Sequence, residues 1–261
     1  MEKSPLKSIC LSPKYWLVLL ILVVPEFGGV AAQSDRIIPD RPGFSTGTWT
    51  VPVGSWYLES GYRYSFRDAS RQNSSSLPMI TVRTGLTPVI ELFSEWDGFE
   101  RNHTITETDG DLPSLGLKYG FFHSDDLDLT LVGSISNHLD GRTYRAGFMA
   151  GLMWEYELTD RVEHFGGIQM ESQPIGGGHE REAALALGME MEVAQKISAF
   201  VEYYTLFPME ERSMLHGTEV GILYYPSDQL QLDLHGGIGV SRELPHYIGL
   251  GVSLMFAANK R

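Results

Sequence analysis

The chain has 261 residues, of which 43% are hydrophobic, and its mean hydropathy is −0.11. No window reaches ~18–20 consecutive apolar residues, so the composition excludes a bundle of membrane-spanning helices. The formal net charge of −13 at pH 7 argues against nucleic acid as a partner and against docking to anionic lipid through charge alone.

The N-terminus has the three parts of a secretory signal peptide. Three lysines precede an apolar run over residues 15–24, and small residues follow at 30–32. We expect cleavage after Ala32; an uncleaved anchor is the alternative. Removing residues 1–32 takes away three Lys and two Glu, which leaves 17 basic and 31 acidic residues and a net charge of −14. Cys10 is lost as well, so the mature chain has no disulfide to stabilise it.

The next segment, residues 33–53, is rich in Pro, Gly, Ser and Thr, and we expect a periplasmic N-terminal arm. From residue 54 to 66 the sequence alternates, and one face carries Trp56, Leu58, Tyr62, Tyr64 and Phe66. A period of two predicts a strand. Strands that cross lipid need ~9–11 residues with apolar side chains outward and aromatic residues at both interfaces, which is the pattern found here.

Eleven further segments repeat this alternation to the end of the chain. They are 77–86, 89–97, 112–122, 127–136, 144–156, 162–171, 182–193, 197–207, 214–225, 230–241 and 246–256. Segment 162–171 is weaker, because His164 and Gly166 fall on its apolar side. Segment 182–193 has the propensity of a helix, but its alternation is strict.

Short connections alternate with longer, more polar ones, as they do in bacterial outer-membrane barrels. The predicted fold is therefore an all-β, transmembrane, antiparallel up-and-down barrel of about twelve strands over 54–256. The first and twelfth strands should pair to close it, because a closed ring satisfies every backbone group in lipid. Outer-membrane barrels usually end on an aromatic residue; here Phe256 is followed by a short tail, 257–261.

The opening of the mature chain carries a recognisable motif. Its residues are Asp40, Arg41, Pro42, Pro52 and Gly54, followed by Leu58-Glu59-Ser60-Gly61 in the first strand. This opening resembles a Gram-negative outer-membrane transporter family catalogued under the name "MetA-pathway of phenol degradation". The chain departs from the family pattern at Gly43, where Asp is usual, and at Val53, where a second Pro is usual. The resemblance implies a barrel that acts as a channel or transporter.

The inward face of the predicted barrel is strongly acidic. The lumen-lining candidates are Glu59, Arg63, Arg83, Glu91, Glu95, Lys118, Arg145, Glu155, Glu190, Glu202, Glu219 and Asp233, to which Glu163, Glu171, Glu182 and Glu192 add further acid. So many carboxylates cannot all be paired, and ionised carboxylates without partners need water. The hypothesis is a narrow aqueous pore that prefers cations or neutral polar solutes. The alternative is a lumen plugged by its own side chains and by the 33–53 arm, because twelve strands lie between filled and open barrels.

Other motifs carry less weight. Residues 43–47 match G-x-S-x-G but lack the strand before and the helix after that a nucleophile elbow needs. His179-Glu180 begins a zinc motif that fails at Ala183. Ser136-Asn137-His138 alternate between two faces of a strand, so they cannot form one hydrogen-bonded site. We expect no catalytic site, no metal and no cofactor.

The sequence thus predicts an outer-membrane channel or transporter for passive uptake of small solutes. Its expected partners are outer-membrane lipid and lipopolysaccharide, the barrel-assembly machinery and a small-molecule solute. The phenol label of the resembled family finds no support in single residues, since the aromatics fall on outward faces and at strand ends. A barrel enzyme acting on lipid or peptide, and a closed structural or adhesive barrel, are the alternatives.

Overall fold

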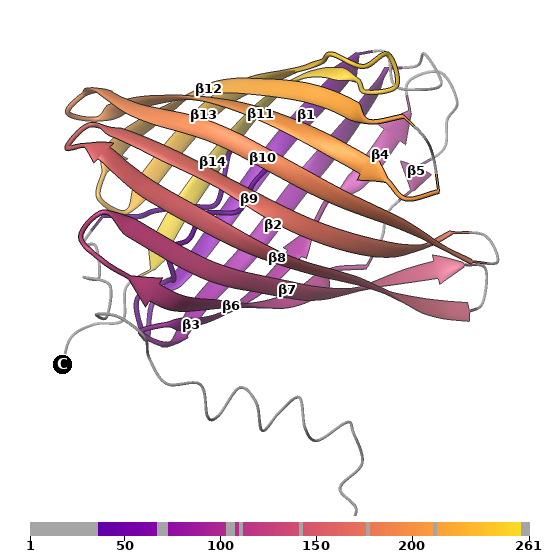
Figure 1. The fold of residues 1–261 in the computed structure, drawn as a ribbon, viewed down its shortest axis with the longest axis horizontal. Coiled ribbons are helices and arrows are strands. Elements are labelled where there is room, and N and C mark those ends of the chain that lie inside the picture. Colours follow the sequence, from indigo (N-terminus) through magenta and orange to yellow (C-terminus); the bar gives the residue numbers. More distant parts are fainter. Residues whose placement is uncertain are drawn as a thin grey trace, which may run out of the picture.

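The structure is a computed structural model that describes residues 36–66, 73–102, 108–109, 112–140, 143–175, 178–210 and 213–256. The predicted signal peptide at 1–32 and the tail at 257–261 lie outside these residues. Figure 1 shows a barrel of long, tilted strands. The strands are β1 (Trp56–Phe66), β2 (Ser74–Thr87), β3 (Ile90–Trp96), β4 (Phe99–Asn102), β5 (Thr108–Asp109), β6 (Ser114–His123), β7 (Leu127–Asp140), β8 (Thr143–Thr159), β9 (Val162–Ile175), β10 (Gly178–Ala194), β11 (Ile197–Pro208), β12 (Leu215–Ser227), β13 (Leu230–Gly239) and β14 (His246–Phe256).

Twelve of these strands form a closed antiparallel ring. From β6 to β14 each strand pairs with the next, β3 joins β6 to β2, and β1 pairs with both β2 and β14. Trp56 lies opposite Phe256 and Phe66 opposite His246, so the closing pair runs the full length of both strands. Every strand of the ring has two partners and no edge is left open. The predicted twelve-stranded barrel is confirmed.

The two remaining strands, β4 and β5, lie in the connection between β3 and β6. At Gly98 the backbone has a φ of 79°, a conformation that favours glycine, and β4 then continues alongside β2 with Phe99 opposite Leu77. β5 pairs with β4 through Thr108 and Arg101. The sequence predicted an irregular loop here, because strands of four and two residues are too short to show alternation.

The two ends of the barrel differ. The short-turn end carries the connections around residues 88–89, 124–126, 160–161, 195–196 and 228–229, and the long-loop end carries the others. At the long-loop end β7 pairs with β8 as far as Asp140 and Thr143, and β9 with β10 as far as Ile175 and Gly178. The sequence predicted loops over 137–143 and 172–181. Strand pairing uses backbone groups alone, so these hairpins continue beyond the point where apolar alternation stops.

The outer wall of the barrel is apolar. Met189, Met191 and Val193 on β10 and Val220 and Ile222 on β12 are 45–56% exposed. Contiguous exposed apolar surface of this extent fits lipid better than water.

In the residues that the structure describes, no helix has the length and apolar character needed to cross a membrane.

The weak strand β9 has a local explanation. The Trp154 ring covers Gly166, where an added Cβ would lie 2.6 Å from Cζ2 of that ring. The Trp154 indole N–H donates to Nε2 of His164 at 3.5 Å, and Nδ1 of His164 lies 2.7 Å from the Gly188 carbonyl oxygen. Gly166 and His164 interrupt the apolar side of this strand. The Trp154 indole covers the first and forms a hydrogen bond with the second.

Candidate functional site

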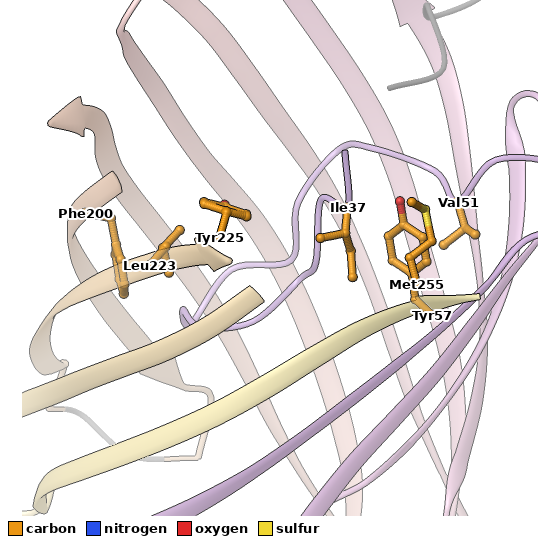
Figure 2. Packing of buried hydrophobic residues seen from close by; sticks show 7 residues of the cluster. All are labelled: Ile37, Val51, Tyr57, Phe200, Leu223, Tyr225 and Met255. Carbon is orange, nitrogen blue, oxygen red and sulfur yellow. The ribbon is translucent and has the colours of Figure 1, made fainter. Parts of the chain in front are cut away.

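The lumen holds the arm that precedes β1. Figure 2 shows the arm passing inside the barrel, with Ile37 between Leu223 and Tyr225 on one side and Tyr57 and Val51 on the other. Ile37 and Val51 are 0% and 1% exposed. The sequence predicted a periplasmic arm and left open whether it fills the lumen; the structure places its described part, residues 36–53, within the barrel.

The twelve residues predicted to line the lumen all lie on the face of their strand that points into the barrel. Seven of them are at most 5% exposed: Glu59, Arg83, Glu91, Lys118, Glu202, Glu219 and Asp233. Four are half-buried: Arg63, Arg145, Glu155 and Glu190. Glu95 remains exposed to the lumen. The lumen is therefore dry where the arm runs and accessible on either side of it.

Arg83 is the centre of the buried charge network. Its Nε lies 2.7 Å from Glu91 Oε1 and its Nη1 lies 2.9 Å from Glu59 Oε1. The guanidinium also lies 3.3 Å from Asp40 Oδ2 and donates to the carbonyl oxygens of Ile38 and Trp49. The planar, five-donor guanidinium suits this arrangement, in which two strands and the arm share one cation.

Four inward carboxylates accept hydrogen bonds from backbone N–H groups of the arm. The N–H to carboxylate distances are 2.7 Å for Phe44 to Glu202, 3.0 Å for Ser45 to Glu202, 2.9 Å for Thr48 to Glu155, 2.8 Å for Val51 to Glu91 and 3.1 Å for Arg41 to Glu59. These carboxylates were expected to need water. Hydrogen bonds from backbone N–H groups replace it, and such bonds to an ionised acceptor are strong.

Asp40 connects the arm to β6 as well as to β2. Its Oδ1 lies 2.5 Å from Nζ of Lys118 and accepts from the backbone N–H of Gly47 at 3.2 Å. The Lys118 ammonium also donates a hydrogen bond to the Gly47 carbonyl oxygen, at 2.9 Å. The first residue of the family-like motif thus closes a loop of the arm and ties it to two strands.

Arg41 rests on a pair of glycines at the seam where the barrel closes. Gly61 on β1 lies opposite Gly251 on β14. An added Cβ at Gly61 would lie 2.3 Å from Cζ of Arg41, and one at Gly251 would lie 2.8 Å from its Nε. Arg41 Nε is 3.8 Å from Asp233 Oδ2, and Gln231 donates to the Arg41 carbonyl oxygen at 2.9 Å. The roles of Gly251 and Gln231 were not predicted from the sequence. Glycines at facing positions of the first and last strands are the signal that could have indicated where Arg41 lies.

The rest of the motif forms the turn that leads from the arm into β1. Gly54 has a φ of 79°, and the Ser55 N–H donates to the Pro52 carbonyl oxygen at 2.9 Å. Val51 passes so close to β2 that a Cβ at Gly85 would lie 2.0 Å from its carbonyl oxygen. Pro42 lies in the arm between two cavities, which are described below, and lines both of them.

Inward rings lie flat against the wall because glycines face them. The cross-strand pairs are Phe93 with Gly116, Phe165 with Gly188, Phe200 with Gly221, Tyr204 with Gly217 and Tyr247 with Gly237. In each pair a Cβ on the glycine would lie within 2.4 Å of the ring. The sequence pattern predicted aromatics on outward faces and at strand ends, and these inward pairs were not predicted. By lying flat, the rings leave space for the arm and present their faces to the lumen.

The arm separates two cavities. The inner cavity, toward the short-turn end, has a volume of about 310 Å³, and Glu155, Glu163 and Glu190 are among its lining residues. The outer cavity, on the other side of the arm, has a volume of about 230 Å³ and includes Glu95. Five arm residues line both: Asp40, Arg41, Pro42, Ser45 and Thr46. The turn over 40–46 is therefore the partition between them.

No group of three or more His, Cys, Asp or Glu side chains in the described residues is arranged to hold a metal ion.

No family model and no curated protein matches the chain. Solved structures do share its fold. An outer membrane channel from Pseudomonas putida F1 matches with a TM-score of 0.62 at 11% identity, over 82% of this chain and 99% of that one. The NanC porin matches with a TM-score of 0.55 at 8% identity (76% and 98% covered), and the KdgM porin with 0.54 at 10% (76% and 99%). At such identities the likeness concerns the fold, which is that of outer-membrane barrels.

Proposed function

We propose that the protein is an outer-membrane channel for passive uptake of small solutes, closed at rest by its own N-terminal arm. The observation that carries the proposal is the pair of cavities separated by the 40–46 turn. Because the two cavities share five residues of that turn, a displacement of the turn alone would join them into one path. The apolar outer wall and the shared fold support a place in the outer membrane.

The path is expected to favour cations. The described lining of the inner cavity carries four carboxylates, those of Asp40, Glu155, Glu163 and Glu190, and two guanidinium groups, those of Arg41 and Arg36. The Arg36 guanidinium lies over the Tyr225 ring at 3.3 Å. An excess of acidic side chains along a narrow path raises the local concentration of cations and repels anions. We also infer membership of the resembled transporter family, because Asp40 and Arg41 of the motif are the residues that fix the arm.

The test is single-channel recording of the refolded mature protein in a planar bilayer with a salt gradient. We expect brief discrete openings whose reversal potential is cation-selective. Glu190→Gln should weaken the selectivity, whereas Glu91→Gln should act on folding instead, because Glu91 is enclosed and bound to Arg83. A folded protein that conducts neither with its arm nor without it would contradict the channel and favour a closed structural barrel.

A further inference from the structure

The outer cavity contains a carboxylate that nothing in the described chain satisfies. Glu95 lines the cavity from β3, and among the described residues it forms no hydrogen bond or ion pair. The charged groups that influence it most are Asp97, Asp40 and Glu59, all acidic, and Arg41. Arg41 lies at the barrel seam, with its Nε 3.8 Å from Asp233 Oδ2. The electrostatic field at Glu95 therefore favours a positive guest.

Among the described lining residues the cavity has two further basic side chains, His235, whose Nδ1 lies 2.8 Å from Asp233 Oδ1, and Arg63, which lies toward the long-loop end. Glu59, Thr81 and Glu95 are aligned across β1, β2 and β3. Arg63 is four residues further along β1, which places its backbone about 13 Å beyond the level of Glu95. Its guanidinium lies 4.8 Å from the centre of the Tyr247 ring. The floor of the cavity, next to the arm, is thus the acidic part.

An apolar wall stands beside Glu95. Phe93, two residues earlier on the same face of β3, lies so flat over Gly116 that a Cβ there would be 2.2 Å from its Cζ. Met149 packs against the cluster formed by Phe93, Val132 and Met153 and, with Met79, also lines the cavity. Aromatic faces attract cations, and flexible thioether side chains adapt to apolar groups of varied shape.

We propose that the outer cavity is a binding site for small organic cations, with an ammonium group on Glu95 and an apolar group against Phe93 and Met149. The site rests on the proposed channel function and names the class of solute that it would take up. The site lies next to the 40–46 turn on its long-loop side, so a solute bound there is adjacent to the segment that separates the two cavities.

Equilibrium binding to the folded, full-length mature protein in amphipol tests the site without requiring passage. The probes are 2-phenylethylammonium and its neutral analogue of similar shape, 2-phenylethanol. Loss of a charge-assisted hydrogen bond is worth about 1.5–3 kcal/mol, so we expect the alcohol to bind roughly tenfold or more weakly than the ammonium. Glu95→Gln should weaken ammonium binding by a similar factor and leave the alcohol unchanged.

Glu157→Gln is the matched control, because Glu157 is exposed at the short-turn end and does not line the outer cavity. It should leave binding of the ammonium unaltered. Equal affinities for the two probes, an unaffected Glu95→Gln protein, or a loss in the Glu157 variant alone would each refute the site. Binding without conductance would keep the site and refute the channel, and conductance without binding would do the reverse.

Discussion

Replacing Gly61 with alanine tests whether Arg41 holds the arm in place. The new Cβ would lie 2.3 Å from Cζ of Arg41, where ordinary contacts are 3.4–4 Å, so the guanidinium must move by about 1 Å or more. The backbone of β1 has no reason to change, because the obstructing atoms are the far end of a flexible side chain. The substitution therefore acts on the arm and spares the wall.

This displacement weakens the interactions that hold Arg41 where β1 and β14 close the barrel. A displaced Arg41 leaves the fully enclosed carboxylate of Asp233 and strains the hydrogen bond from Gln231 to the Arg41 carbonyl oxygen. Losing an interaction with a buried charged group costs about 1–3 kcal/mol, which shifts a closed-to-open equilibrium by roughly 5–150-fold.

Two assays read this shift. One is open probability in a planar bilayer. The other is the rate at which a charged thiol reagent modifies Thr46→Cys, which is feasible because the only natural cysteine, Cys10, lies in the predicted signal peptide. Both should rise in Gly61→Ala.

Gly120→Ala is the matched control, since a Cβ at this inward strand glycine meets nothing closer than 3.6 Å. A Cβ at Gly251 would lie 2.3 Å from Asp233 Oδ2 and 2.8 Å from Arg41 Nε, so Gly251→Ala should disturb the same Arg41–Asp233 pair and raise both readouts, and the double variant should add little. Equal open probabilities and labelling rates for Gly61→Ala and Gly120→Ala would refute the reasoning.

Two further changes probe the arm and its anchor. Deleting residues 33–53 behind an intact signal peptide should give a larger and more continuous conductance, measured in bilayers, and an unchanged conductance would show that the arm is not the barrier. Arg83→Met should lower the free energy of unfolding by about 3–5 kcal/mol, measured by denaturant titration in detergent, because it leaves the enclosed carboxylates of Glu59 and Glu91 without their cation; a loss below 1 kcal/mol would contradict the central place of Arg83.

The barrel was predictable because its signal is local and repeated. In each strand lipid on one side and the lumen on the other impose a period of two, and that period extends through β8 and β14 without a break. The same alternation identifies which residues of each strand point into the barrel, and Glu59, Lys118 and Glu202 were predicted on the lumen side for this reason. Even the doubtful segment 182–193 came out as a strand, since strict alternation outweighs helix propensity.

The arm was not predictable in the same way. Its partners are far away in sequence: Ser45 bonds to Glu202 and Thr48 to Glu155. The arm has no periodic pattern in its sequence, and the groups that bind the carboxylates are its backbone N–H donors, which every residue except proline has. The surplus of inward acid was the one available clue, and it was compatible with water as well as with an internal partner. The position of Glu95 beside the outer cavity likewise depends on the path of the arm.

The arm also has a mechanical consequence. A ring in which each strand is bonded only to its neighbours can flatten toward an ellipse at little cost to any single strand pair. The arm ties β3, through Glu91 and Val51, to β11, through Glu202 and Phe44. Those two strands stand diametrically opposite in the order of the ring. The segment that separates the cavities is thus also a cross-brace that keeps the cross-section round, so withdrawing it would soften the barrel's shape at the moment a path opens.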